Sequence, residues 1–212
     1  MSNIGVFGGS FDPPHIGHRA LVEAALYELA LDEVWVIPVG MAVHRQLTSD
    51  ISAEQRLAWV QKMFMGMDKV RVLDWEVTQA RAVASIEVMR DLNEQLDSVP
   101  VWLMGMDAWL GLPDWIDYPE HAQCCNVAVF PRQDEKSLYA GKVHADWQQV
   151  DLLSKLQTGQ VYWAHASLPA VSATQIRQDI LTGKDVSTVL DARIADDIQS
   201  AYKYKSSNGE NE

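Results

Sequence analysis

The sequence predicts an α/β fold, doubly wound, with a mostly parallel sheet of five or six strands and helices on both faces. Short runs rich in β-branched and aromatic residues alternate along the chain with longer helical patterns, which is typical of right-handed βαβ units. Two of these runs, at residues 34–37 and 101–104, are apolar without alternation, as strands covered on both faces are. Together these observations predict a Rossmann-like arrangement.

Each element has its own place in this pattern. The strands are predicted, in chain order, at residues 4–7, 33–37, 69–73, 100–104, 126–130 and 160–164. The helices are predicted at residues 17–29, 53–65, 83–96, 115–123, 173–181 and 188–202. Ser52 and Ser172 support two of the helix starts, because each has a glutamine three positions later, as in a capping box. Gly183 fits the end of the helix that begins after Ser172.

Length and composition restrict the domain organisation and the class of protein. The 212 residues fit one domain, with residues 206–212 as a frayed tail. There are 17 Lys and Arg against 29 Asp and Glu, a net charge of −12, which argues against nucleic acid or an anionic membrane as a partner. No apolar run approaches the roughly 18 residues of a membrane span, and two adjacent cysteines build no disulfide framework. We therefore expect a cytoplasmic protein.

The segment at residues 8–18, Gly-Gly-Ser-Phe-Asp-Pro-Pro-His-Ile-Gly-His, joins the first strand to the first helix. In doubly wound sheets ligands bind where strands end at their carboxyl side. Gly8 and Gly9 allow a close backbone approach and positive φ, and a helix N-terminus offers N–H groups to phosphate. His15 and His18, three residues apart, are able to face the same spot. The segment predicts an anion cradle with two imidazole donors.

Other interpretations of this segment remain open at this point. It is not a dinucleotide-binding G-x-G-x-x-G loop, and no Walker A loop occurs in the chain. The glycines and prolines alone would shape a turn, with the histidines capping a helix. A metal site at His15 and His18 lacks a third ligand at characteristic spacing, so we predict none.

A second anion site is predicted near the end of the chain. Ser172 caps a helix whose first N–H groups are free. Side chains of a helix tilt toward its N-terminus, so Arg177 reaches back over that first turn, where its planar fork suits phosphate oxygens. A capped surface helix with a solvated arginine is the alternative interpretation.

The ends of the remaining strands carry further candidate ligands. His44 and Arg45 follow the second strand and supply cations for a phosphate, or else belong to a solvated loop. Gly105 follows the fourth strand and permits close approach, while Asp107 can accept from ribose hydroxyls or cap a helix. Arg132 follows the fifth strand and is a further candidate contact for phosphate.

These segments resemble a known superfamily. Residues 8–18 are similar to the first signature of the H-x-G-H nucleotidyltransferases, and residues 171–177, Val-Ser-Ala-Thr-Gln-Ile-Arg, to their second signature, I-S-[SA]-T-x-x-R. Within the superfamily the chain most resembles the bacterial nicotinate-nucleotide adenylyltransferase family, over nearly its whole length. Residues 37–40, 44–45, 104–107 and 112–115 give further support.

The resemblance implies transfer of the adenylyl group of ATP to the 5′-phosphate of nicotinate mononucleotide, a step of NAD biosynthesis that releases pyrophosphate. It implies catalytic roles for His15, His18 and Arg177. The implied ATP-binding residues are Gly8, Gly9, Ser10, Phe11, Gly105, Asp107, Ser172 and Thr174. The implied acceptor-binding residues are His44, Arg45, Ser85, Trp115 and Arg132, with Trp115 stacked on the pyridine ring. The implied cofactor is Mg²⁺, carried with ATP and taking few protein ligands.

Departures from the family pattern leave the acceptor open. Residues 83–85, Val-Ala-Ser, stand where the family often has S-Y-T, and residues 42–43, Ala-Val, where it often has two prolines. Met106 replaces Ala or Gln. Nicotinamide mononucleotide or phosphopantetheine is therefore an alternative acceptor, and a non-catalytic nucleotide-binding module or a metal-dependent hydrolase an alternative function. The sequence also leaves open the oligomeric state, a homo-oligomer included, and whether residues 132–143 close over substrate.

Overall fold

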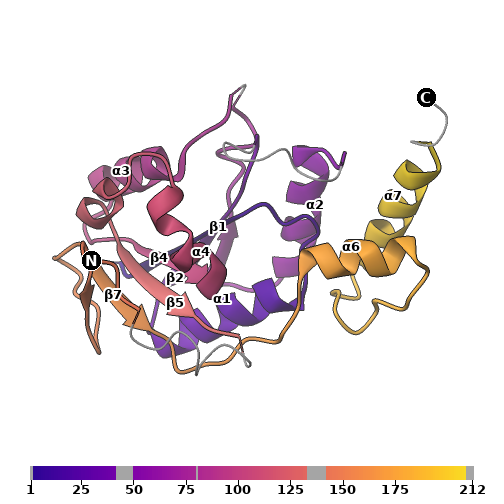
Figure 1. Cartoon of the computed structure of the whole chain (residues 1–212). Helices are drawn as coiled ribbons and strands as arrows, with labels where there is room; N and C mark the ends of the chain where they lie inside the picture. The colour runs from indigo at the N-terminus through magenta and orange to yellow at the C-terminus, as the bar shows by residue number, and fades with distance from the viewer. Residues whose placement is uncertain (1, 42–49, 80, 133–141, 209–212) are drawn as a thin grey trace.

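A computed structural model describes residues 2–41, 50–79, 81–132 and 142–208, and it holds one parallel sheet with helices on both faces (Figure 1). The strands are β1 (Ile4–Gly9), β2 (Glu33–Pro38), β3 (Val70–Val72), β4 (Val101–Gly105), β5 (Asn126–Phe130), β6 (Gln148–Gln149) and β7 (Gln160–Trp163). The helices are α1 (Ile16–Glu28), α2 (Ala53–Phe64), α3 (Ser85–Gln95), α4 (Met106–Leu110), α6 (Ala173–Leu181) and α7 (Ala195–Asn208), and two 3₁₀ helices are η1 (Leu112–Asp114) and η2 (Glu120–Gln123).

The strand order creates the place where ligands bind in folds of this class. The sheet reads β3-β2-β1-β4-β5-β7-β6, and every neighbouring pair is parallel. The chain starts in the middle at β1, winds outward through β2 and β3, and returns to β4 on the other side of β1. The carboxyl ends of β1 and β4 therefore flank the switch point of the sheet.

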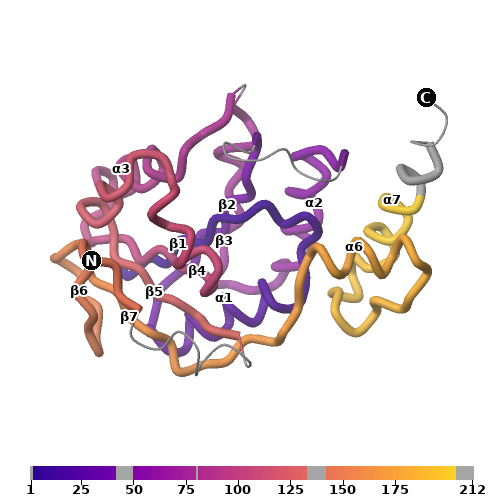
Figure 2. Tube along the Cα trace, in the orientation of Figure 1, coloured from indigo at the N-terminus to yellow at the C-terminus, as the bar shows by residue number. Residues whose placement is uncertain are grey.

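Two apolar clusters hold the helices on the sheet. Residues of β1 alternate between them, because Ile4 and Val6 point to one face and Phe7 to the other. The cluster containing Phe7 packs α1, α2, α6 and α7, and the second cluster packs α3 and α4. Figure 1 shows α1 on one side of the sheet and α3 and α4 on the other. In Figure 2, α6 and α7 follow the last strand and lie together beyond α2.

The structure confirms the α/β class and the six predicted strands, and it adds a seventh. That strand, β6, has two exposed glutamines and no apolar pattern that would reveal it. The helix predicted at 115–123 is wrong: turns and the short η2 occupy this stretch. Pro119 has no N–H to donate, and Asp117 has a φ of +59°, which a right-handed helix does not allow.

Two helices also differ from the sequence expectation. The short helix α4 directly after β4 was not predicted. The last helix begins at Ala195 rather than at residue 188 and runs to Asn208, so the first residues of the predicted tail are helical. Among the helices of the described residues, none is long and apolar enough to cross a membrane.

Candidate active site

The turn between β1 and α1 stacks the two histidines on each other. Their ring centroids are 3.7 Å apart and their planes differ by 19°. Gly17 makes this arrangement possible, because a Cβ atom there would lie 3.0 Å from His15 Nδ1. The glycine of the H-x-G-H pattern is therefore needed for the space that the His15 ring occupies.

His18 has a defined tautomer. Its Nδ1 accepts a hydrogen bond of 3.1 Å from the His15 backbone N–H. A neutral His18 ring assigned from this partner carries its proton on Nε2, which is then a donor. The ring is held by Phe11, whose centroid is 4.8 Å away in an edge contact. The alternative of helix-capping histidines is thus correct for His18 Nδ1, but it leaves the Nε2 donor for a ligand.

Both histidines are neutral near pH 7. Burial lowers the pKa of His15 from 6.5 to about 4, and the positive charge of Arg132 acts in the same direction. Burial also holds the pKa of His18 well below its usual range, with further lowering by His15 and Arg132. The two imidazole donors of the sequence analysis are therefore single N–H groups on uncharged rings, and the positive charge at this site belongs to arginines.

The N-terminus of α1 offers fewer free donors than the sequence predicts. The Ile16 N–H donates to the Val189 carbonyl oxygen at 3.1 Å, and the His18 N–H to the His15 carbonyl oxygen at 2.9 Å. The His15 N–H is taken by the His18 ring. Three N–H groups that were expected to face phosphate are therefore used inside the protein.

The roles of Gly8, Gly9 and Phe11 in the turn differ from the prediction. Gly8 and Gly9 end β1, and neither has positive φ; Phe11 does, at +47°. A Cβ atom on Gly8 would lie 3.0 Å from the Trp102 ring, and one on Gly9 would lie 3.3 Å from the Phe11 ring. The glycines are thus required for close packing, and the left-handed backbone conformation occurs at Phe11.

The second signature lies against the first. Arg177 Nη1 donates to the Asp12 carbonyl oxygen, and Nη2 donates to Thr174 Oγ1 at 3.1 Å. The Asp12 carboxylate is 3.7 Å from Nη1, so an ion pair reinforces the contact. A Cβ atom on Gly17 would touch Val171 Cβ at 3.8 Å. Two segments about 160 residues apart therefore form one polar surface.

The N-terminus of α6 differs from that of α1. Ser172 occupies the N-cap position, but its hydroxyl makes no capping hydrogen bond. The Ile176 N–H bonds to the Ser172 carbonyl oxygen at 3.0 Å as the first α-helical contact, and N–H groups before this point have no helical acceptor. Ser172 and Thr174 are exposed. This helix start is open to an anion, whereas that of α1 is mostly closed.

Across the switch point, Arg132 and Asp107 form an ion pair of 3.0 Å between Nη2 and Oδ2. Arg132 is also close enough to lower the pKa of both histidines, which places its charge at the histidine turn. Gly105 is the N-cap of α4, so the alternative of Asp107 as the cap is wrong. Among the described residues, no atom lies within 4 Å of a Cβ atom built on Gly105, and the Asp107 side chain is 72% exposed. With respect to this part of the chain, the space over β4 is therefore open.

The predicted acceptor residues are only partly placed. Ser85 is the first residue of α3 and is half-buried. Trp115 follows η1, packs on the second apolar cluster, and meets the His121 ring edge-on at 5.9 Å. No contact recorded for either residue reaches the histidine turn within the described part of the chain, so their acceptor role stays a prediction. His44 and Arg45 lie outside the described residues, as does most of the 132–143 segment.

The sequence analysis missed Arg56, which is 1% exposed on α2. Its Nη1 donates to the Ser10 carbonyl oxygen at 2.5 Å, and its Nη2 to the Gly40 carbonyl oxygen at 3.0 Å. A pattern in the sequence could have revealed it, since Arg56 shares the helical stripe of Trp59, Val60 and Met63, where an apolar residue is expected.

Asp12 and Tyr202 were also missed. The Asp12 side chain is buried and its Oδ1 accepts from the Tyr202 hydroxyl at 2.6 Å. Tyr202 belongs to α7, and its ring stacks near Trp59 of α2 with centroids 6.2 Å apart. The carboxylate that faces Arg177 is therefore held from the C-terminal helix.

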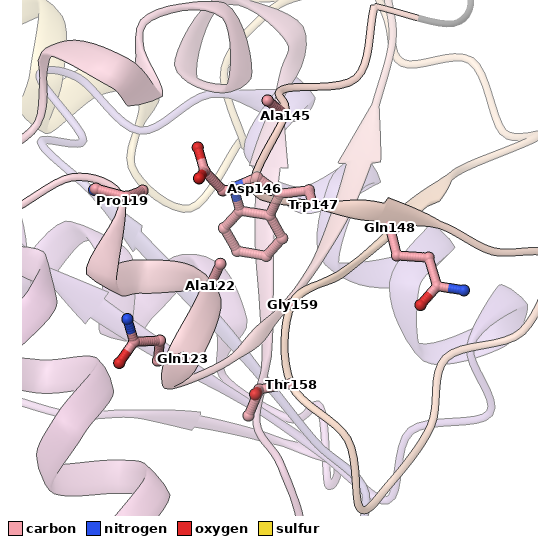
Figure 3. Close-up of a pocket in the computed structure, with 9 residues that line it drawn as sticks. All are labelled: Pro119, Ala122, Gln123, Ala145, Asp146, Trp147, Gln148, Thr158 and Gly159. Carbon is pink, nitrogen blue, oxygen red and sulfur yellow. The ribbon is translucent and has the colours of Figure 1, made fainter.

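A separate cavity of about 440 Å³ lies away from these residues (Figure 3). It is lined by side chains of η2, β6 and the turn before β7, with Asp146, Trp147 and Thr158 among them. Gly159 precedes β7, so this cavity is at the amino end of that strand, opposite to the carboxyl ends where the histidine turn lies. None of the predicted site residues lines it.

No group of three or more His, Cys, Asp or Glu side chains is arranged to hold a metal ion within residues 2–41, 50–79, 81–132 and 142–208. Charge at the site is instead carried by arginines. Arg177 meets the histidine turn from α6, and Arg132 meets it from the end of β5. An arrangement of fixed N–H donors and guanidinium groups is suited to binding phosphate and to stabilising charge on it.

Comparison with known proteins identifies the class to which this site belongs. Residues 6–179 match the family model described as cytidylyltransferase-like, a span that includes both signatures. The chain belongs to the cytidylyltransferase-like family. It is 33% identical over 213 residues to the probable nicotinate-nucleotide adenylyltransferase of Pseudomonas aeruginosa (strain UCBPP-PA14), covering 95% of this chain and 97% of the relative. It is 31% identical to the protein of that name from Chromobacterium violaceum, covering 96% and 99%.

Solved structures have the same fold. The chain is similar to the Plasmodium falciparum nicotinic acid mononucleotide adenylyltransferase complexed with NaAD, with a TM-score of 0.68 and 15% identity over 97% of this chain and 96% of that one. The complex of the same Plasmodium falciparum enzyme with APC gives a TM-score of 0.63 over 98% and 96%. At this level of identity the likeness establishes the fold.

Proposed function

We propose that the protein transfers the adenylyl group of ATP to the 5′-phosphate of nicotinate mononucleotide, giving nicotinate adenine dinucleotide and pyrophosphate in NAD biosynthesis. The observation that carries this proposal is the Arg177 contact with Asp12 and Thr174, which joins the histidine turn to the open start of α6. Relatives that match over at least 95% of this chain and bear the name of this activity support it.

The reaction needs positioning more than proton transfer. An acceptor phosphate oxygen attacks the α-phosphorus of ATP in line, a P–O bond forms, and the bond from the α-phosphorus to the oxygen that bridges to the β-phosphorus breaks. The acceptor phosphate is already ionised at neutral pH, so no strong general base is required. Neutral histidines agree with this, since their part is to donate hydrogen bonds to phosphate oxygens as charge develops.

Each polar group at the turn has a role in the proposal. His18 donates from Nε2 to the α-phosphate, and His15 donates to the phosphate chain. Ser10 and the Phe11 backbone hold the triphosphate, and Gly8 and Gly9 keep the strand end free of side chains. On the facing helix, Arg177 and the 172–174 turn hold the departing pyrophosphate.

The remaining residues divide between the nucleoside and the acceptor. Gly105 leaves room over β4 for the nucleoside. Asp107 accepts hydrogen bonds from the ribose hydroxyls in addition to its contact with Arg132. We assign the acceptor to residues of four segments: His44, Arg45, Ser85, Trp115 and Arg132.

Mg²⁺ would arrive with ATP and would neutralise part of the charge of its phosphates. The carboxylates at the site fit this, because each already has a protein partner: Asp12 contacts Tyr202 and Arg177, and Asp107 contacts Arg132. The protein would then contribute few ligands. We place the reaction in the cytoplasm, the compartment expected from the apolar runs and the two cysteines of the sequence. The net charge of −12 argues against nucleic acid or an anionic membrane as a partner. The proposal does not fix the oligomeric state, and a homo-oligomer fits it.

The test is a coupled assay of pyrophosphate release with ATP and Mg²⁺ and a panel of acceptors. Nicotinate mononucleotide should be turned over fastest. Faster turnover of nicotinamide mononucleotide or phosphopantetheine would identify that compound as the acceptor instead. The Val-Ala-Ser sequence at 83–85, which departs from the family pattern, is the reason for testing both. Pyrophosphate release with none of the three would contradict adenylyl transfer.

A further inference from the structure

Arg56 is an unusual residue for the place it occupies. It lies on the buried stripe of α2, is 1% exposed, and makes no ion pair within 4.0 Å among the described residues. Burial lowers its pKa, and the negative charges of Asp12, Glu54 and Glu76 act in the opposite direction. A buried guanidinium is costly, and each satisfied donor reduces that cost. Nη1 and Nη2 of Arg56 each donate to a carbonyl oxygen, whereas its Nε has no hydrogen-bond partner among the described residues.

The two carbonyl groups belong to turns after neighbouring strands. β1 and β2 pair in register to Gly9 opposite Pro38, and the Val39 N–H still bonds to the Gly9 carbonyl oxygen at 2.9 Å. Ser10 and Gly40 are the residues that follow Gly9 and Val39. Arg56 bridges their carbonyl oxygens, at 2.5 and 3.0 Å. The guanidinium therefore continues the connection between the two chains after the ladder ends.

These contacts fix the direction of two backbone N–H groups. In a trans peptide the C=O and N–H bonds point in opposite directions. The Ser10–Phe11 and Gly40–Met41 peptides are not among the cis bonds of the described residues. With the carbonyl oxygens turned to the buried guanidinium, the N–H groups of Phe11 and Met41 point away from it.

Arg177 acts on the same turn from the other side. It binds the Asp12 carbonyl oxygen. The residues on either side of Phe11, Ser10 and Asp12, therefore each have their carbonyl oxygen bound by an arginine. Phe11 has a φ of +47°, a conformation that a non-glycine residue keeps only where its surroundings enforce it. The two arginines supply that constraint.

Glu76 completes the arrangement at Gly40. The Glu76 carboxylate is 5% exposed, and the Gly40 backbone N–H is close enough to lower its pKa. A Cβ atom on Gly40 would lie 2.2 Å from the Glu76 carbonyl oxygen, so only glycine fits there. The peptide groups on both sides of Gly40 are thus held, one by Glu76 and the other by Arg56.

We propose that Arg56 is a positioning residue which, with Glu76, orients the turns after β1 and β2 so that the Phe11 and Met41 N–H groups face the phosphates of the nucleotide substrate. The inference rests on the proposed function for the identity of that substrate. It assigns to a buried side chain, which touches no ligand, the orientation of donors that do.

The experiment compares Arg56→Lys, Arg56→Met and Glu76→Leu with the wild type. Binding of inorganic tripolyphosphate is measured by calorimetry at a temperature well below each unfolding midpoint, and the KM for ATP is measured separately from kcat. Both Arg56 variants should weaken tripolyphosphate binding and raise the KM for ATP by about tenfold or more, as expected for a misdirected donor to a charged group. A lysine keeps the charge but cannot span two carbonyl groups, so it should not rescue.

Arg193 supplies a matched control. Its guanidinium also binds two backbone carbonyl oxygens, those of Met63 and Met65 at the end of the same helix, at 2.6 and 2.9 Å. Arg193→Met should lower stability without changing tripolyphosphate affinity. In the wild type, the ¹⁵N amide signals of Phe11 and Met41 should shift on tripolyphosphate addition, and in Arg56→Lys these shifts should shrink.

Wild-type affinity and amide shifts in a folded Arg56→Lys protein would overturn the inference. If neither Arg56 variant folds, Glu76→Leu decides, because it keeps Arg56 but removes the acceptor oxygen that Glu76→Gln retains beside the Gly40 N–H. It should reduce the Met41 shift, and an unchanged shift overturns the proposal. Failure of the proposed function is a different result: wild-type protein would bind tripolyphosphate through these amides but release no pyrophosphate with any acceptor.

Discussion

His18 presents one defined donor because its other ring nitrogen is used inside the protein. The His15 N–H occupies Nδ1, and Phe11 packs edge-on against the ring. The uncharged ring keeps its proton on Nε2 over the whole neutral range, since the pKa is well below its usual value. A donor fixed in this way needs no reorganisation when negative charge grows on a phosphate oxygen.

Replacing His18 by alanine should therefore slow the chemical step itself. We expect kcat to fall by a factor on the order of 10³, the cost of removing one preorganised transition-state donor. The measurement is pyrophosphate release at saturating ATP and acceptor. His165→Ala, at an exposed histidine beside Tyr162, is the control and should keep wild-type turnover. Wild-type kcat in His18→Ala would remove His18 from the mechanism.

Residues with a dense local pattern could be predicted from the sequence, and isolated ones could not. Glycine and proline around His15 and His18 mark a constrained turn, and Arg177 follows a recognisable helix start. Arg56 stands alone in an ordinary helix, where an arginine normally extends to solvent. Its place on the stripe of Trp59, Val60 and Met63 indicates burial, but only the contacts with Ser10 and Gly40, both distant in sequence, reveal what it binds.

At the scale of elements, the two helix starts at the site are not equivalent. α1 uses its first N–H groups for Val189, His15 and the His18 ring, whereas α6 begins with exposed Ser172 and Thr174. The anion site that the sequence predicted at both helices is therefore mostly an α6 feature. Arg177 adds a guanidinium over the same turn.

Arg177→Ala should therefore damage the use of ATP more than the use of the acceptor. It removes a charged fork from the open helix start and the link to Asp12. We expect the KM for ATP to rise by about tenfold or more, the loss for a hydrogen bond to a charged group, with a smaller change in the acceptor KM. Arg177→Lys should recover only part of the loss, because its ammonium lacks the planar fork. A defect confined to the acceptor would contradict the assignment.

The C-terminal helix supports the site through a buried hydrogen bond. Tyr202→Phe removes the donor at 2.6 Å from Asp12 Oδ1 while leaving the ring beside Trp59. We expect a loss of about 1–3 kcal/mol in the free energy of unfolding, measured in urea, since a buried carboxylate loses a partner. Tyr27→Phe, at a tyrosine that is 91% exposed, should cost almost nothing. Equal stability of Tyr202→Phe and wild type would show that this hydrogen bond contributes little.

Elements with a strong apolar pattern were predicted, and elements shaped by their surroundings were not. The six strands follow from β-branched and aromatic runs, and β4 and β5 are buried on both faces. β6 is an edge strand of two glutamines that exists through pairing with β7. The stretch at 115–123 was predicted as a helix, but Pro119 and the φ of Asp117 divide it into turns.

For the molecule as a whole, global and local charge have opposite signs. The chain has a net charge of −12, yet three arginines lie near the carboxyl ends of the central strands: Arg56, Arg132 and Arg177, which contact Ser10, Asp107 and Asp12. Charges within a cleft dominate its potential over the screening length of roughly 8 Å at physiological salt. Residues 8–18 and 171–177, in which the sequence predicts two anion sites, share this edge, as the Arg177 contacts show.

Glu76 makes the stability of the whole molecule depend on pH near neutrality. Burial raises its pKa from 4.5 to about 7, although the Gly40 N–H and the charge of Arg56 oppose this. Between these values the folded protein holds a proton that the unfolded chain has released. By linkage, the contribution of this group to the free energy of unfolding falls as the pH rises from about 4.5 to 7.

Glu76→Gln should remove this dependence. The free energy of unfolding, measured in urea, should rise in the variant relative to the wild type between pH 5 and pH 8, by at most about 3 kcal/mol. His15 changes the free energy of unfolding with pH in the opposite direction, because its pKa of about 4 in the folded protein lets the unfolded chain bind a proton first below pH 6.5. This contribution is the same in both proteins and cancels in the difference. Glu87→Gln is the control: the Arg81 contact lowers the pKa of Glu87, so its difference from wild type should stay constant over this range. A Glu76→Gln difference that does not change with pH would mean that Glu76 is not a buried carboxyl group titrating near pH 7.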